Sequence, residues 1–473
     1  MPGAQTNSSW DVLLDVSGPG ADPLVSALRT AIRSGVLAQG TALPPSRKLA
    51  EDLSCSRWVV TQAYAQLVAE GYLVARTGSA TRVRWSGSPD QTKPPAPAKK
   101  APRYDLAPGL PDLRAFPRKR WVDAIREVLA VVPHTELGVP PAGGHPKLRA
   151  ILAGYLRRVR GAATDDVRIC AGVTDGVFMV CRALHEAGFT QIAVEEPGWT
   201  RVWRAAERAG LEVVPVAVDE EGLRVKDIPG KVRAVIVTPA HQFPSGVVLS
   251  AGRRAELLAW AREVDGLILE DDYDAEFRYD RKPIGTLQGM DPHRVVLLGS
   301  VSKTLSPALG IGWCVVPPLW RHKVQGSAPP VLDQLAMAEF IEDGGYDRHL
   351  RKTRLRYRAR RDALLKALGG AKISGAAAGL HLLLHVEPGT STRMLIRYAE
   401  RRGLKLVDLD TYRSSPGEPA LVLGYGNLAD TAVTEAVKIL RSGLRDVEVV
   451  REPGGERDVA LHLDPAADEQ QRR

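Results

Sequence analysis

The sequence predicts a protein of two parts, a small α+β module near the N-terminus and a large α/β domain after it. The chain has 473 residues, more than one ordinary hydrophobic core serves. A proline-rich stretch at 86–103 cannot bury a core and favours an extended spacer. We therefore expect a module at 13–85, a linker at 86–103, a large domain at 104–451 and a polar tail at 452–473.

The composition excludes several classes of protein. Hydrophobic residues make up 44% and charged residues 25%, as in soluble globular proteins. No apolar run approaches the ~20 residues that span a bilayer, and the N-terminus has no secretory signal. The cysteines form no C-x-x-C pair and have no metal-ligand spacing: Cys55, Cys170, Cys181 and Cys314. We expect a cytoplasmic protein with no structural metal and no membrane partner.

The N-terminal module reads as three helices and a hairpin. Leu24, Leu28 and Ile32 have helical spacing, and Gly35 ends that helix. Ser46 and Ser56 are expected to cap a second and a third helix, separated by a helix-turn-helix spacing. The third helix would turn four residues inward and end at Gly71: Val60, Ala63, Tyr64 and Leu67. Segments 72–74 and 81–84 then read as a β-hairpin wing around Gly78.

Basic residues gather in this module. Between Asp22 and Trp85, eight Lys/Arg stand against four acids, a net charge of +4 within the chain's +9. The third helix of such a unit enters the major groove of DNA by its N-terminal end. We therefore expect double-stranded DNA to be contacted by Ser46, Arg47, Lys48, Arg57, Trp58, Thr61 and Gly78. The alternative is a small helical bundle with a solvated basic face.

The large region alternates short apolar runs with helical segments. Strands are expected at 167–169, 191–194, 213–216, 234–237, 267–269 and 295–298. Buried parallel strands of an α/β domain have this pattern. Ligands bind beyond the carboxyl ends of such strands, and polar segments follow most of them here.

One such segment places Lys303 behind Ser300 and Ser302, after the run 295–298. A lysine that captures an aldehyde needs a rigid position and a partner for its electrophile, and a pyridoxal phosphate site supplies both. Hydroxyl groups beside the lysine would suit the phosphate. The alternative is a surface lysine in a serine-rich loop.

Four other segments could complete that site. A carboxylate of Glu270-Asp271-Asp272 could face a pyridine nitrogen and Tyr273 a ring oxygen, unless these residues form a metal-binding or solvated acidic loop. The turn at Val173-Thr174 opens a helix and could hold a phosphate, or be an ordinary turn. Trp199 could stack on a cofactor ring or belong to the core. In the loop 238–246, His241 or Gln242 could contact the ring, unless that loop is a mere turn.

These motifs together carry a resemblance to known families. The segment Leu43-Pro-Pro-Ser-Arg-Lys-Leu-Ala-Glu-Asp-Leu and the helix after it resemble the winged helix-turn-helix of the GntR regulators over 22–85. A small departure is Val59, where that family often has threonine, which puts one phosphate contact in doubt. The segments 241–246, 270–277 and 300–303 resemble the fold-type I pyridoxal phosphate aminotransferases. Their combination resembles the MocR/GabR subgroup, including its PdxR type.

The resemblance implies roles for individual residues. Lys303 would form the Schiff base with pyridoxal 5'-phosphate, Asp271 would meet the pyridine nitrogen and Tyr273 the phenolic oxygen. The ring would stack on Trp199, with His241 nearby, and an effector carboxylate would meet Arg201. The phosphate would be held by Ser300, Ser302, Val173 and Thr174.

Two positions depart from those families. Gly310 stands where many relatives have an arginine that clamps the phosphate, a loss of roughly 1.5–3 kcal/mol per charged hydrogen bond. Asn427 stands where aminotransferases have an arginine for the substrate carboxylate, and an amide cannot replace a bidentate guanidinium.

The sequence therefore predicts a pyridoxal phosphate-responsive transcription regulator. Its effector would be the cofactor itself, or the cofactor with an amino compound. The resemblance implies a head-to-tail homodimer on a repeated or palindromic operator. The alternatives are an active aminotransferase that carries a DNA-binding module, and a scaffold that binds DNA without the cofactor.

Overall fold

The computed structural model describes residues 20–76, 79–85, 101–164, 166–279, 284–375 and 377–448. The chain divides into two compact units at the 101–102 peptide bond, and each is described by itself. Most of the predicted linker and all of the predicted tail lie outside the described residues, as does Gly78 in the predicted wing.

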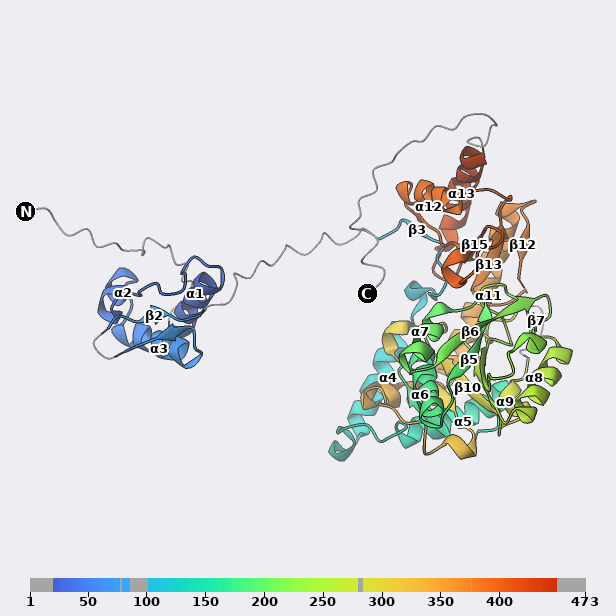
Figure 1. Ribbon diagram of the computed structural model, residues 1–473, viewed down its shortest axis with the longest axis horizontal. Helices are drawn as coiled ribbons and strands as arrows, with labels where there is room; N and C mark the ends of the chain where they lie inside the picture. The colour runs from blue at the N-terminus through green and yellow to red at the C-terminus, as the bar shows by residue number, and fades with distance from the viewer. Residues whose placement is uncertain are drawn as a thin grey trace, which may run out of the picture. The chain divides into compact units, whose positions relative to one another are not determined.

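The first unit contains the predicted helix-turn-helix and wing (Figure 1). Its elements are α1 (Ala21–Arg33), α2 (Ser46–Asp52), α3 (Arg57–Ala69), β1 (Leu73–Val74) and β2 (Arg82–Val83). The strands pair antiparallel, with Leu73 opposite Val83. The expected inward face of α3 is buried against α1, which confirms the helical spacing seen in the sequence.

The two predicted helix caps have different outcomes. Ser56 caps α3, because its hydroxyl accepts a hydrogen bond from the Val59 N–H at 3.4 Å. The prediction that Ser46 caps α2 is wrong. Pro45 is the N-cap residue, and Ser46 is already the first residue of the helix. The Ser46 hydroxyl instead accepts a weak hydrogen bond from Arg57 Nε at 3.4 Å, which links the starts of the two helices.

The second unit is built on an eight-stranded sheet with the order β4-β11-β10-β9-β8-β5-β6-β7. The pairs from β10 to β6 are parallel, while β11 and β7 run antiparallel to their neighbours. The strands are β4 (Val167–Cys170), β5 (Gln191–Glu196), β6 (Glu212–Asp219), β7 (Gly222–Leu223), β8 (Ala234–Val237), β9 (Leu267–Asp271), β10 (Val295–Ser300) and β11 (Gly312–Val315). All six strands expected from the sequence are present.

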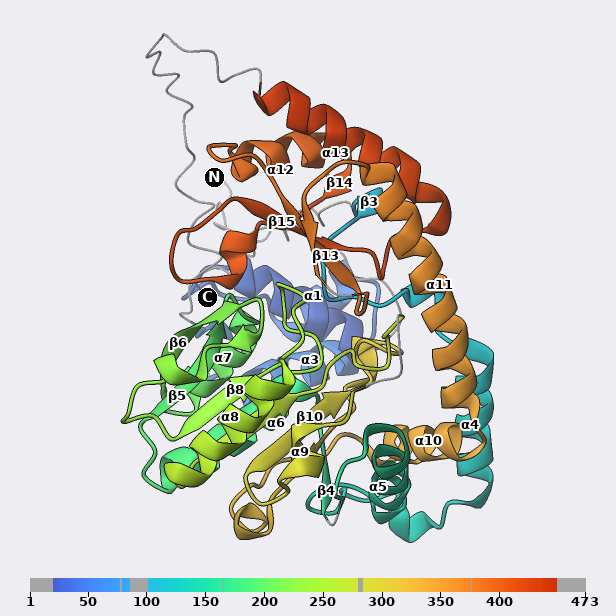
Figure 2. The same cartoon turned by 90° about the vertical axis from the view of Figure 1, so that its right-hand side faces the viewer.

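Helices cover both faces of this sheet. Side chains of β9 alternate, so that Leu267 and Leu269 join one core cluster and Ile268 joins another. The first cluster contains α6 (Val173–Glu186) and α7 (Thr200–Arg208), and the second contains α8 (Ala251–Glu263) and α9 (Leu287–Met290). Figure 2 shows α8 and α9 lying along the sheet. Burial on both faces explains why these strands read as continuous apolar runs.

The remaining elements surround this layer. The helices are α4 (Arg118–Val131), α5 (Pro146–Arg160), α10 (Val331–Glu342), the long α11 (Gly345–Leu368), α12 (Thr392–Arg401) and α13 (Val433–Glu448). A small sheet contains β12 (Ile373–Ser374), β13 (His381–His385) and β15 (Ala420–Gly424), and β3 (Tyr104–Asp105) pairs parallel with β14 (Leu404–Lys405). Within the part of the chain described, no helix is both long and apolar enough to cross a bilayer.

The two serines provide a test of the cap assignment. Ser56→Ala should destabilise the start of α3 by about 1 kcal/mol, because the Val59 N–H loses its partner. Hydrogen exchange of the α3 peptides, measured in the full-length protein, should quicken by roughly fivefold. Ser46→Ala is the matched control and should change exchange little. An equal effect of both substitutions would contradict the assignment.

Candidate functional site

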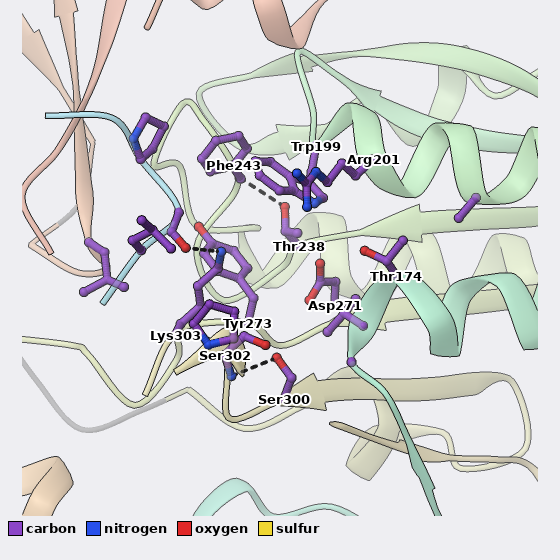
Figure 3. A pocket seen from close by; sticks show the side chains of 18 of the residues that line it. Thr174, Trp199, Arg201, Thr238, Phe243, Asp271, Tyr273, Ser300, Ser302 and Lys303 are labelled. Atoms are coloured by element: carbon purple, nitrogen blue, oxygen red, sulfur yellow. Dashed lines mark hydrogen bonds between the residues drawn. The ribbon is translucent and has the colours of Figure 1, made fainter. Parts of the chain in front are cut away.

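A cavity of about 730 Å³ lies at the carboxyl ends of the parallel strands in the second unit (Figure 3). It is lined by nine of the predicted site residues: Val173, Thr174, Trp199, Arg201, Asp271, Tyr273, Ser300, Ser302 and Lys303. The segments after β4, β5, β9 and β10 thus meet at one edge of the sheet, as parallel strands require. His241, Asn427 and Gly310 are not among the described residues that line this cavity.

Lys303 is one of the residues that line this cavity. Its Nζ donates a hydrogen bond to the Gly109 carbonyl oxygen at 2.6 Å and lies 5.3 Å from the Trp199 ring centroid. Burial lowers the pKa of Lys303 from its ordinary value, although the nearby Asp271 carboxylate opposes this shift. A lysine that loses its proton more readily is a better nucleophile. Gly109 was not expected from the sequence, where no motif marks it.

Asp271 is a buried carboxyl group with an unused oxygen. It is 5% exposed, and its Oδ1 has no hydrogen-bond partner among the described residues. Burial raises the pKa of Asp271 to about 8, even though Lys303 acts in the opposite direction. Asp271 pairs with Leu298 in the parallel β9–β10 register, and this pairing holds the carboxyl group beside the loop of Lys303. A buried acceptor of this kind suits a cationic N–H donor from a ligand.

His241 lies behind Tyr273 rather than on the cavity wall. The Tyr273 hydroxyl is 3.1 Å from His241 Nδ1, which is also 3.0 Å from Asp274 Oδ2. Gly379 has a φ of 71°, and a Cβ there would lie only 2.1 Å from His241 Cε1. Any larger residue at position 379 would collide with His241 and Asp274, so this position requires glycine. Burial raises the pKa of Tyr273 well above its ordinary value, so that its hydroxyl remains protonated.

The N-terminus of α6 provides backbone donors at the cavity. Its cap residue Gly172 has a φ of 135° and no side chain to accept from the first N–H groups of the helix. Val173 and Thr174 open the helix on the cavity wall. Free N–H groups at a helix N-terminus bind anions, phosphate in particular. The Ser302 N–H donates to Ser300 Oγ at 3.4 Å, so the two predicted serines are neighbours in space.

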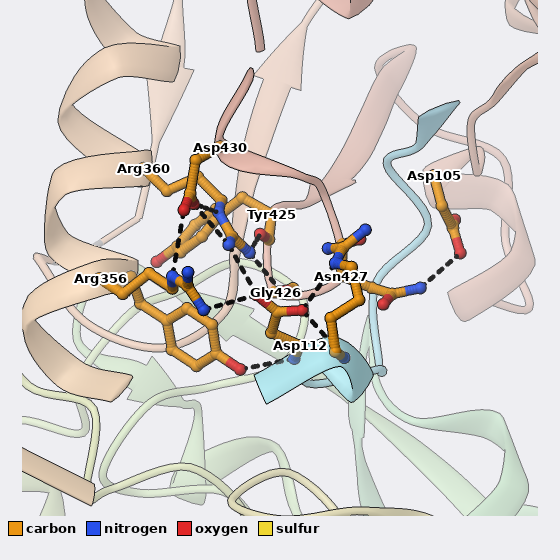
Figure 4. Close-up of polar contacts among 10 residues, drawn as sticks. Asp105, Asp112, Arg356, Arg360, Tyr425, Gly426, Asn427 and Asp430 are labelled. Carbon is orange, nitrogen blue, oxygen red and sulfur yellow. Dashed lines mark hydrogen bonds and ion pairs between the residues drawn. The ribbon is translucent and has the colours of Figure 1, made fainter. Parts of the chain in front are cut away.

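Asn427 belongs to a polar network beside the cavity (Figure 4). The Asn427 side-chain nitrogen donates to Asp105 Oδ2 at 3.3 Å, and the Asn427 backbone carbonyl oxygen accepts from Arg114 Nη2 at 2.7 Å. The buried Arg360 of α11 joins this network through Asp112 at 2.9 Å and Asp430 at 2.6 Å. No sequence pattern identified Arg360, because its partners lie about 250 and 70 positions away in the chain.

A buried ion pair supports the loop of Asp271 from below. Arg160 donates to both oxygens of Asp272, at 2.7 and 2.8 Å, and both side chains are almost fully buried. Asp271 and Tyr273 line the cavity. Asp272 instead pairs with Arg160, and Asp274 contacts His241, both in the protein interior. The sequence analysis did not assign these structural roles to Asp272 and Asp274, because their partners Arg160 and His241 lie 112 and 33 positions away in the chain.

Five of the predicted DNA-binding residues are exposed in the first unit. Arg57, Trp58 and Thr61 are exposed on the first turns of α3, and the Trp58 side chain is 66% exposed. The Thr61 hydroxyl donates to the Arg57 carbonyl oxygen at 2.9 Å. Arg47 and Lys48 are exposed on α2, where Arg47 pairs loosely with Glu51 at 3.5 Å.

The sequence matches two protein families in different regions. Residues 21–83 match the bacterial regulatory proteins of the gntR family, and residues 105–404 match aminotransferase class I and II.

Two regulators and one enzyme illustrate the similarity. The pyridoxine biosynthesis transcriptional regulator PdxR of Corynebacterium glutamicum is 32% identical over 85% of this chain and 91% of the relative. The "Probable rhizopine catabolism regulatory protein MocR" of Rhizobium meliloti is 32% identical over 92% of this chain and 95% of the relative. The crystal structure of the multiple substrate aminotransferase of Thermococcus profundus superposes with a TM-score of 0.68 at 24% identity, covering 74% of this chain and 93% of that one.

The buried carboxyl group of Asp271 predicts a dependence of stability on pH. The unfolded chain releases this proton near pH 4, whereas the folded chain holds it to about pH 8. The folded state therefore binds more protons in this window, and its stability falls as the pH rises. Asp271→Asn should flatten the curve and raise the free energy of unfolding at pH 7, without added ligand, by about 1–4 kcal/mol.

Calorimetry from pH 5 to 8, without added ligand, measures this difference. Asp362→Asn is the control, since it makes the same substitution at an exposed residue of α11. Parallel curves for the wild type and Asp271→Asn would show that Asp271 titrates normally in the folded protein.

Proposed function

The chain belongs to the MocR-type regulators of the GntR family, which join a helix-turn-helix unit to an aminotransferase class I and II domain, and from this we propose that it is a transcription regulator that responds to pyridoxal phosphate. The observation that carries the proposal is the unpaired buried Asp271 facing the same cavity as Lys303. The exposed α3 face of the first unit would bind the operator.

The residues of the cavity fit pyridoxal phosphate. The cofactor supplies an aldehyde that an amine can attack and a ring that withdraws electrons. The free Oδ1 of Asp271 would accept from a protonated ring nitrogen, and Tyr273 would donate to the ring oxygen. The N–H groups at the start of α6, with Ser300 and Ser302, would bind the phosphate. Trp199 would stack on the ring.

Lys303 would couple capture of the cofactor to a change in its contact with Gly109. The lowered pKa of Lys303 leaves more of its amine unprotonated, and the Gly109 carbonyl aims Nζ into the cavity. Covalent capture would remove Nζ from Gly109. Because Gly109 follows β3, and β3 pairs with β14, that change would reach the elements around the cavity. A ligand that binds one arrangement more tightly shifts the population toward it.

The site favours sensing over rapid amino-acid turnover. Asn427 holds Asp105 and is not on the described cavity wall, and an amide cannot fork onto a carboxylate as arginine does. Lys303, Asp271 and Tyr273 nevertheless form the set that an aminotransferase needs, and so partial transamination remains the second candidate. We further propose a cytoplasmic head-to-tail homodimer in which two α3 helices bind paired half-sites.

Titration of operator binding with the cofactor tests this function. In the wild type, pyridoxal phosphate should change operator affinity severalfold and produce a visible absorption band. Lys303→Ala should lose both responses and still bind DNA, because Lys303 lies outside the first unit. Arg57→Ala should show the reverse, with the band retained and DNA affinity reduced roughly tenfold.

Two outcomes would contradict the proposal. Operator affinity that is the same with and without the cofactor, in a protein that shows the band, would remove the sensing role. Rapid multiple turnover with a panel of amino acids and keto acids would instead establish an aminotransferase.

A further inference from the structure

Three cations line the cavity without a hydrogen bond or ion pair to any described residue. They are Arg201 and Arg208 of α7 and Lys405 of β14. By contrast, Arg182 of α6 donates a hydrogen bond to the Gln325 carbonyl oxygen at 2.6 Å. Free cations around a cavity indicate an anionic ligand.

The two arginines of α7 occupy one face of the helix. Positions 201, 205 and 208 follow the i, i+4, i+7 pattern, and all three residues line the cavity. Ala205 leaves the space between the two guanidinium-bearing side chains open. At 1.5 Å per residue, the two arginines are attached about 10 Å apart along the helix axis.

The two arginines lie beside different aromatic residues of the cavity wall. The Arg201 guanidinium lies 6.0 Å from the Trp199 ring, the ring that Lys303 also faces at 5.3 Å. The Arg208 guanidinium lies 5.4 Å from the Phe178 ring, in the second turn of α6. Thr174, Asp175 and Phe178 line the cavity together, so Arg208 belongs to the end formed by the N-terminal turns of α6.

The N-terminus of α6 supplies backbone donors to the cavity, but the loop that contains Gly310 supplies no cation. Gly310 closes the short turn Pro307–Leu309 with a φ of 56° and carries no side chain. Ser300 and Ser302 are neutral. A phosphate ester carries up to two negative charges near neutral pH, and its binding is strongest where charged donors meet it.

We propose that Arg208 is the cation that binds the phosphate group of the cofactor, a task performed from helix α7 because the loop at Gly310 cannot perform it. This inference rests on the proposed binding of pyridoxal phosphate to the cavity. The long side chain of Arg208 has no other described partner to leave, apart from the face of Phe178. Arg201 remains available for the anionic group of an effector.

Comparison of two aldehydes tests the assignment. Pyridoxal has the ring and aldehyde of pyridoxal phosphate but lacks the phosphate. The full-length wild type should bind pyridoxal phosphate much more tightly, as followed by the visible absorption band. Arg208→Ala should weaken pyridoxal phosphate binding by at least about tenfold and leave pyridoxal binding unchanged, since only a phosphate contact is removed.

Three controls make the result specific. Arg204→Ala removes an exposed arginine of the same helix that is not on the cavity wall, and it should leave both affinities unchanged. Arg208→Lys should recover part of the loss. Inorganic phosphate should compete with pyridoxal phosphate less well in Arg208→Ala than in the wild type.

The proposal is wrong if Arg208→Ala weakens the binding of both aldehydes equally, which would indicate a structural role for Arg208. It is also wrong if the substitution weakens the binding of neither. Failure of the proposed function would look different. In that case the wild type would show no absorption band, or would show the band without any change in operator affinity.

Discussion

The parallel pairing of β9 with β10 is the interaction on which the rest of the site depends. It sets Asp271 beside Leu298, and thereby places a buried carboxyl group next to the loop that carries Lys303. Burial favours the uncharged form of both groups, because it raises the pKa of Asp271 and lowers the pKa of Lys303. The sheet thus maintains an acid and an amine that are poorly solvated and incompletely paired. Such a site is costly to the folded protein unless a ligand completes it.

Rigid supports offset that cost. Asp272 forms a two-point ion pair with Arg160, and Asp274 holds His241 against the Tyr273 hydroxyl. Removal of one partner from a buried pair of this kind generally costs about 3–5 kcal/mol. Along the segment 271–274, residues therefore alternate: Asp271 and Tyr273 line the cavity, while Asp272 and Asp274 bind partners in the interior. A similar division is present in α7, where Arg201 and Arg208 face the cavity and Val202 and Ala206 pack in the core.

Membership of the MocR-type regulators explains why a DNA-binding unit and an aminotransferase fold occur in one chain. It does not by itself assign a ligand, because one fold supports many activities. In this chain the differences from an efficient aminotransferase are local. Asn427 binds Asp105, Gly310 presents no cation, and unpaired cations stand on α7 and β14 instead.

The sequence by itself determined the two-part organisation, the helices of the first unit, the positions of six strands along the chain and nine residues of the cavity wall. These follow from local patterns, namely helical spacing, apolar runs and polar segments directly after strands. Its errors and omissions were of another kind. The N-cap residue of α2 is Pro45 rather than Ser46, one residue earlier than predicted. Residue preferences alone do not locate the end of a helix to within one residue. Gly109, Arg160, Arg208 and Arg360 reach their partners only through contacts between segments distant in the chain, so the tertiary structure alone decided their places.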